Sequence, residues 1–335
     1  MLRVIPRSPV VVSLALVALS ITGLGCSRGN SGGGAAAPPF NGTYQGEGPM
    51  TIFCTTGQVA DAIRNLVGDR AQVVGIMGPG VDHHHYQVLP SDILALKRAD
   101  MVFYSGLHLE GRMIETLESF VTQKPVVAMA NILVERQDKR LRQPSEFEGF
   151  YDPHVWHDVA LWADCVDYAA QRLATFDPAH ADLYRQRAKA YRERLMELDT
   201  YCREQISSIP EERQILVTTH DAFGYFSMAY GLEAIGLKGI STEDEADFQH
   251  IDEVRDLIVS RKIPAVFVES STPPALMRQL VELCAKAGHK LHVGLTTEEE
   301  LYADALGPPD SGADTYEGMI RANVDRIVRG LRTGL

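Results

Sequence analysis

The chain carries three consecutive histidines, His83, His84 and His85, in the segment VDHHHYQVLPSD. A neutral imidazole is a good ligand for a divalent transition metal. Three adjacent side chains cannot all face one ion, so at least two of them must do something else. Taken alone, the run is explained equally well as a polar, solvated loop. A metal site here would use one of the three histidines and would need partners from other parts of the chain.

Three residues in separate segments are candidates for such partners. His154 lies in YDPHVWHD, His220 follows the apolar run RQILVTT, and Asp314 lies in GADTYEGM. Three imidazoles and one carboxylate suit a borderline divalent ion in a tetrahedral or distorted site. Structural explanations are also open: His154 would occupy a first helical turn and His220 would be a satisfied core histidine. Asp314 would cap a helix together with Glu317.

The elements that must position these residues alternate along the chain. From Met50 onward, β-rich runs such as TIFCTT, QVVGIM and MVFYSG alternate with helix-like segments, which predicts parallel sheets covered on both faces. Residues 178–208 include a long charged stretch without Gly or Pro, which predicts one long helix. We therefore expect an α/β fold of two lobes, 50–177 and 209–335, each a parallel β-sheet flanked by helices, joined by one long rigid connecting helix. Ligands bind outside the carboxyl ends of such strands, so we expect the site in a cleft between the lobes.

The N-terminal segment precedes the predicted fold. Two arginines stand before an apolar run of roughly 15 residues, short of the about 20 that span a bilayer, so residues 1–26 are predicted to be a secretory signal peptide. The small residue before Cys26 favours a lipoprotein signal, in which Cys26 carries a lipid anchor to the membrane; simple cleavage nearby is the alternative. Residues 27–49 are rich in Gly, Ser, Ala and Pro, which is typical of a flexible tether. The predicted location is the periplasm or the outer face of the cytoplasmic membrane.

The charge and the cysteines argue against other classes of function. A formal net charge of −12 leaves no basic stripe for nucleic acid and is compatible with attracting cations. The remaining cysteines show no CxxC spacing, which argues against a zinc ribbon or a thioredoxin-type motif. Disulfides would be permitted in an export compartment, whereas single cysteines in apolar segments are more often inert core residues. The sequence leaves this choice open for Cys54, Cys165, Cys202 and Cys284.

Four ordered motifs resemble one family over nearly all of the chain from Thr51 to Leu331. VDHHHYQVLPSD is similar to GxDPHxYxPxPSD, DPHVWHDV to DPHxWLDP, VTTHDAFGYF to VTxHDAFGYF, and YADALGPPDSGADTYEGMIRANV to SDALGxxGxxxxTYxGMIxxNV. These motifs are typical of the cluster A-I solute-binding proteins of bacterial ABC transporters, the zinc and manganese receptors of the TroA type. The resemblance implies a monomeric receptor, not an enzyme, that binds Zn²⁺ or Mn²⁺ as cargo and delivers it to an ABC permease and its ATPase.

In that family each motif supplies one metal ligand, and the resemblance assigns the ligands to His84, His154, His220 and Asp314. His83 stands where the family has proline and His85 stands at a variable position, which leaves open whether either competes for the ion. A set of three nitrogens and one carboxylate favours zinc, with manganese as the close alternative.

Two other classes of function compete with this interpretation. A zinc-dependent hydrolase could use the same ligands, but a catalytic zinc typically has three protein ligands and an open position for water. The sequence also has no HExxH motif. A surface adhesin or interaction lipoprotein would agree with a lipid anchor, but it would leave the four motifs unexplained.

Overall fold

The first half of the chain forms one parallel sheet. The computed structural model describes residues 38–145, 147, 149–296 and 298–334. Four strands lie in the order β2-β1-β3-β4, and all three pairings are parallel. Their bounds are β1 Met50–Cys54, β2 Ala71–Gly75, β3 Met101–Tyr104 and β4 Val126–Ala128.

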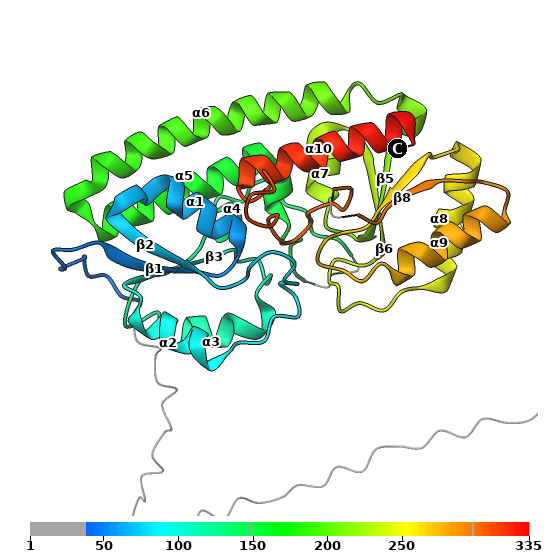
Figure 1. The fold of residues 1–335 in the computed structure, drawn as a ribbon. Helices are drawn as coiled ribbons and strands as arrows, with labels where there is room; N and C mark the ends of the chain where they lie inside the picture. Colours follow the sequence, from blue (N-terminus) through cyan, green and yellow to red (C-terminus); the bar gives the residue numbers. More distant parts are fainter. Residues whose placement is uncertain (1–37, 146, 148, 297, 335) are drawn as a thin grey trace, which may run out of the picture. The chain divides into compact units, whose positions relative to one another are not determined.

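Helices cover both faces of this sheet, as Figure 1 shows for α1 on one side and α2 and α3 on the other. Successive side chains of a strand point to opposite faces. Accordingly, Ile52 of β1 lies in the core that α1 and α5 complete, whereas its neighbour Phe53 packs in a second core with Leu96 of α2 and Leu117 of α3. The helices are α1 Gly57–Val67, α2 Pro90–Arg98, α3 Ile114–Glu118, α4 Asn131–Glu135 and α5 Val159–Phe176.

The second half repeats the parallel pairing in two separate two-stranded sheets. Strand β5, Ile215–His220, pairs with β6, Glu233–Lys238, and is buried at every residue. Strand β7, Ala265–Phe267, pairs with β8, His292–Gly294. A single bridge joins Glu269 to Leu301 beyond the end of β7. The helices are α7 Gly224–Tyr230, α8 Phe248–Arg261, α9 Ala275–Lys286 and α10 Tyr316–Thr333.

One long helix, α6 Ala181–Ile206, connects the halves (Figure 1). Its 26 residues span about 39 Å at about 1.5 Å per residue. Its buried residues recur every three or four positions and form one stripe: Tyr184, Ala188, Tyr191, Leu195, Leu198, Cys202 and Ile206. Helix α6 packs against α5, α1 and α10, and α10 in turn contacts α1 of the first half and β5 and β7 of the second. Two helices therefore contact both halves.

The predicted α/β fold with helix-flanked parallel sheets and a long connecting helix is confirmed. Contacts group residues 38–335 into one compact unit, so the lobe boundaries at 177 and 209 stay predictions. Short 3-10 helices complete the described chain: η1 Gly68–Arg70, η2 Gly111–Met113, η3 Val155–His157, η4 Pro178–His180 and η5 Glu211–Arg213.

The predicted signal peptide 1–26, the predicted anchor Cys26 and the first part of the predicted tether 27–49 lie outside the described residues. Within the tether, the backbone N–H of Phe40 donates to Val121 O at 2.7 Å and that of Tyr44 donates to Phe176 O at 2.6 Å. Among the helices of residues 38–334 that the structure describes, none has the length and apolar character needed to cross a membrane.

The cysteines of the described chain are core residues. Cys54, Cys165, Cys202 and Cys284 are all buried and all free. Burial raises the pKa of the Cys54 and Cys165 thiols far above the ordinary range, which keeps both protonated. Of the two explanations that the sequence left open, the inert one therefore holds for these four residues.

Candidate metal centre

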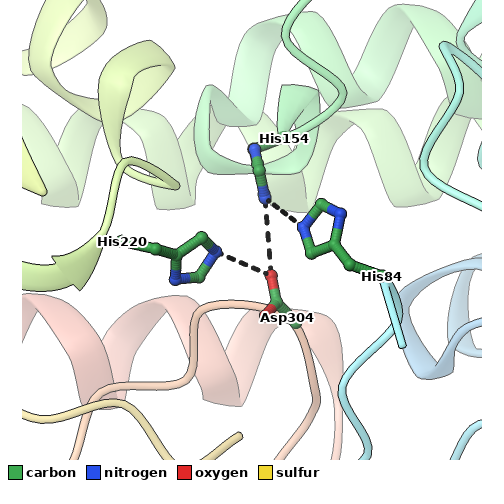
Figure 2. Close-up of side chains that lie close together, drawn as sticks. All are labelled: His84, His154, His220 and Asp304. Carbon is green, nitrogen blue, oxygen red and sulfur yellow. Dashed lines mark hydrogen bonds and ion pairs between the residues drawn. The ribbon is translucent and has the colours of Figure 1, made fainter. Parts of the chain in front are cut away.

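Four side chains from four separate segments converge on one point (Figure 2). They are His84, His154, His220 and Asp304, and one ligand atom of each lies within 4.8 Å of the others. The Nε2 atoms of His84 and His154 are 3.3 Å apart. Oδ1 of Asp304 lies 3.5 Å from Nε2 of both His154 and His220. Three nitrogens and one oxygen around a common point are the donor set of a tetrahedral transition-metal site.

His84 reaches this group from the loop that follows β2. The carboxylate of Asp82 holds the loop, because its Oδ1 accepts the backbone N–H groups of His84 at 2.9 Å and of His85 at 3.3 Å. Its Oδ2 accepts the hydroxyl of Thr242 in the second half, 2.6 Å away. His84 is the one member of the group that is only partly buried. It is therefore the ligand that solvent can approach.

His154 precedes η3 and is fully buried. Oδ1 of Asp152 accepts its backbone N–H at 2.9 Å and its ring Nδ1–H at 2.8 Å. A carboxylate on one ring nitrogen fixes the tautomer and the orientation of the imidazole. The bond to Nδ1 leaves the lone pair of Nε2 facing the centre of the group.

His220 is the last residue of β5, and a second carboxylate orients it in the same way. Oε2 of Glu269 accepts its Nδ1–H, while Oε1 accepts the backbone N–H groups of Thr219 and His220 at 2.9 and 3.1 Å. Glu269 follows the short strand β7 and is buried. Nε2 of His220 is thereby directed at Asp304.

Asp304 completes the group. It is fully buried in the loop after Leu301, where the single bridge to Glu269 holds the chain. Its Oδ2 accepts the hydroxyl of Ser271 at 3.1 Å, and its backbone oxygen accepts the amide of Gln58 at 2.7 Å. These contacts leave Oδ1 turned toward the histidines.

The structure places Asp304 in this group, and not Asp314, the residue predicted from the fourth motif. Asp314 is exposed and directly precedes Thr315, whose side chain caps α10, so it lies at a helix entrance and outside the group. Both aspartates fall in the fourth motif, and the signal that identifies Asp304 is its place in YADALG, opposite the aspartate of SDALG. No sequence signal predicts Asp152 and Glu269, which orient two of the histidines.

Charges in the metal-free group are uneven. Burial lowers the pKa of His84 to about 3, so its ring is neutral. Burial also opposes charge on His154 and His220, but the neighbouring carboxylates outweigh it and raise the pKa of both, most strongly that of His220. The pKa of Asp304 is held well below its usual range, because the charges of the histidines outweigh burial. These pKa directions show that the group stabilises positive charge at its centre.

Two ligand atoms of this group have no hydrogen-bond partner within the part of the chain that the structure describes. They are Nε2 of His220 and Oδ1 of Asp304, and both are buried. Leaving buried polar atoms unpaired is costly and calls for an explanation. A cation at the point they share would satisfy both, so the residues present fit a divalent metal ion.

The flanking histidines of the run do not join the group. His83 is 2% exposed, and its ring forms a T-shaped contact with that of Trp156 at a centroid distance of 6.3 Å. His85 is exposed, and its Nδ1 lies 3.2 Å from a carboxylate oxygen of Glu243. Of the three adjacent imidazoles, only that of His84 reaches the centre.

A cavity of about 250 Å³ opens beside His84 and is lined by both halves of the chain. Arg112 and Phe150 line it from the first half, and Glu243 lines it from the second. Arg112 and Glu243 form an ion pair across this opening. The cavity gives solvent a route to the one ligand that is partly exposed.

Comparison with known proteins identifies the family. Residues 52–330 match the model of the ZnuA family, described as zinc-uptake complex component A, periplasmic. The chain belongs to this family. ZnuA-family membership confirms the resemblance to the metal-binding solute-binding proteins of ABC transporters that the four motifs indicated.

Proteins similar to this chain are named for different metals. The chain is 39% identical to the manganese-binding lipoprotein MntA of Bacillus subtilis over 283 residues, which is 84% of this chain and 90% of that protein. It is 39% identical to the zinc-binding protein TroA of Treponema pallidum over 285 residues, 85% of this chain and 90% of that protein. The solved structure of periplasmic TroA aligns with a TM-score of 0.79 at 38% identity, covering 85% of this chain and 99% of that one.

Proposed function

We propose that this protein is an extracytoplasmic receptor that binds one Zn²⁺ or Mn²⁺ through His84, His154, His220 and Asp304. It hands the ion to an ABC permease and its ATPase, and it acts as a monomer held at the membrane by a lipid on Cys26. The observation that carries the proposal is the convergence of four ligand atoms within 4.8 Å from four separate segments. ZnuA-family membership and the names of the two relatives support it.

The ion is cargo in this proposal, and zinc is the ion we expect the isolated protein to prefer. Three imidazole nitrogens and one carboxylate oxygen rank zinc above manganese, which stands at the weak end of the Irving–Williams order. Manganese stays the alternative because one relative is named for that ion, and the supply of metals in the cell can override intrinsic affinity.

A hydrolytic role fits the geometry less well. Four protein ligands fill a tetrahedral shell, whereas a catalytic zinc keeps a position for water. The two carboxylates nearest the histidines, Asp152 and Glu269, both accept hydrogen bonds from ligand histidines and from backbone N–H groups. Neither is placed as a general base for a metal-bound water, so a receptor is the better conclusion.

The test is a competition titration of the metal-free protein, lacking the predicted signal peptide, with Zn²⁺ and Mn²⁺ against a chelator of known affinity. One ion per chain and displacement of manganese by zinc are expected. His84→Ala and His220→Ala should each abolish tight binding while the fold is retained, as judged by circular dichroism. Absence of saturable binding for both ions would overturn the proposal.

A further inference from the structure

Arg142 joins two carboxylates that stand beside two different metal ligands. Its Nη1 forms an ion pair with Oδ2 of Asp152, and its Nη2 lies 3.2 Å from Oδ2 of Asp221. Asp152 precedes His154 by two residues, and Asp221 directly follows His220. One guanidinium therefore connects the segment before α5 to the segment after β5.

The link to His154 runs through a shared carboxylate. Oδ2 of Asp152 receives Arg142, while Oδ1 of the same group accepts both the ring Nδ1–H and the backbone N–H of His154. The side chain of Asp152 is completely buried, and that of Arg142 is 20% exposed. A buried carboxylate needs a counter-charge and full hydrogen bonding to keep one position. Arg142 supplies the counter-charge and the hydrogen bond to Oδ2, while His154 satisfies Oδ1.

Two residues of α7 fix the backbone and the guanidinium of Arg142. The hydroxyl of Tyr225 donates to the backbone oxygen of Asp152 at 3.0 Å and accepts the backbone N–H of Arg142 at 3.1 Å. Gly224, the first residue of α7, packs directly on the guanidinium, and a Cβ built on it would overlap Nη1 and Cζ. A side chain at position 224 would therefore displace the arginine.

We propose that Arg142 is a positioning residue of the metal site: by bridging Asp152 and Asp221 it holds His154 and His220 in the geometry that binds the ion. It does not touch the ion itself. This inference rests on the proposed receptor function and extends it to a residue that none of the four motifs contains. Its effect on affinity passes through Asp152 to His154 and through Asp221 to the end of β5.

The charge of Arg142 and its role in positioning predict opposite effects of Arg142→Ala on the affinity for zinc. A positive charge near a cation site weakens binding, so a role through charge alone would make Arg142→Ala bind zinc more tightly. A role in positioning would make it bind more weakly, because partners of ligand residues typically contribute about 10–100-fold to metal affinity. We expect the positioning effect to dominate, so that Arg142→Ala lowers the affinity for zinc by about 10–100-fold.

Arg140 provides a matched control two residues away. It also bridges two carboxylates, with Nη2 2.6 Å from an oxygen of Asp138 and 2.6 Å from one of Asp164. Neither of these carboxylates contacts a residue of the metal group. Arg140→Ala therefore removes a similar double ion pair without touching the site.

The experiment measures zinc dissociation constants by chelator competition for the wild type, Arg142→Ala, Arg142→Lys and Arg140→Ala. It also records the visible absorption of Co²⁺ in the site, which reports ligand geometry. Arg142→Ala should lose about 10–100-fold and change the Co²⁺ spectrum. Arg142→Lys keeps the charge but lacks the planar fork, so its affinity should fall between those of Arg142→Ala and the wild type. Arg140→Ala should match the wild type in both readouts.

Gly224→Ala tests the same idea without removing the arginine. In the wild-type background it should weaken zinc binding, since the new Cβ displaces the guanidinium; in the Arg142→Ala background it should have little further effect. Such non-additivity is the signature of one shared interaction.

Three results would overturn the inference. They are unchanged or tighter zinc binding by Arg142→Ala, an equal loss in Arg140→Ala, and additive losses for Gly224→Ala and Arg142→Ala. If the wild type itself bound no zinc, the proposed receptor function would be overturned first, and this inference with it.

Discussion

Replacing Asp304 with asparagine should remove most of the affinity for zinc, whereas the same change at Asp314 should leave it intact. Asparagine keeps the size of the side chain and removes the charge on Oδ1, which lies 3.5 Å from Nε2 of both His154 and His220. Since both histidines must be neutral to bind metal, the charge that Oδ1 would face in the bound state is that of the ion. Two unit charges at a separation of about 3.5 Å interact by about 5 kcal/mol with an effective dielectric constant of about 20, and a divalent ion in direct contact would interact more strongly. Part of this is offset by desolvation, and removing one partner of a buried pair costs about 3–5 kcal/mol.

That range corresponds to a dissociation constant roughly 10²–10⁴ times larger, because each increment of about 1.4 kcal/mol changes the constant tenfold. Asp314 is exposed, so water and salt screen its charge, and Asp314→Asn should bind within about twofold of the wild type. The assay is zinc competition against a chromophoric chelator with both variants measured side by side. Equal losses in the two variants, or a larger loss in Asp314→Asn, would refute the placement of Asp304 in the site.

Three further outcomes are expected. Zinc binding near pH 6.5 should release as many as two protons, because His154 and His220 have raised pKa values and must be neutral to bind metal, whereas His84 with a pKa of about 3 releases none. As the pH increases, the number of protons released on zinc binding should fall and the affinity for zinc should rise. Calorimetry in buffers of different ionisation enthalpy measures the proton release. A release that grows with pH would contradict the pKa directions. Free zinc at a thousand times its dissociation constant should stabilise the fold by about 4 kcal/mol, seen as a raised Tm that a chelator reverses. His85→Ala should bind zinc with an affinity within about twofold of that of the wild type in the same competition assay, since the His85 side chain is exposed and lies outside the group. A loss of affinity equal to that of His84→Ala would show that the wrong histidine of the run is assigned.

Three members of the site could be predicted from the sequence because each stands at a recognisable place. His220 ends a six-residue strand that is buried throughout, so the apolar run before it marks its position. His84 and His154 lie in motifs with enough fixed residues to set their register.

Asp304 could not be placed by strand reasoning, since only the single bridge at Leu301 precedes it and one bridged residue leaves no pattern in a sequence. Asp314 was assigned only through the resemblance of its motif, and its position directly before Thr315, the cap of α10, agrees with the structural explanation of a carboxylate at a helix entrance. Glu269 was missed for a similar reason, because it follows a strand of only three residues. Arg142 lies in a loop, and its two partners are brought to it only by the tertiary fold.

In the proposed receptor, the unequal burial of the four ligands would make the affinity for the ion and the rate of its release depend on different parts of the molecule. Helices α6 and α10 each contact both halves, which opposes a wide opening of the three fully buried ligands. The loop of His84 is tied to the second half by the hydrogen bond between Asp82 and Thr242 and borders the cavity that reaches solvent. We therefore expect the residence time of the ion to follow the lifetime of that loop contact. A permease that detached this one loop could unload the receptor without separating its halves.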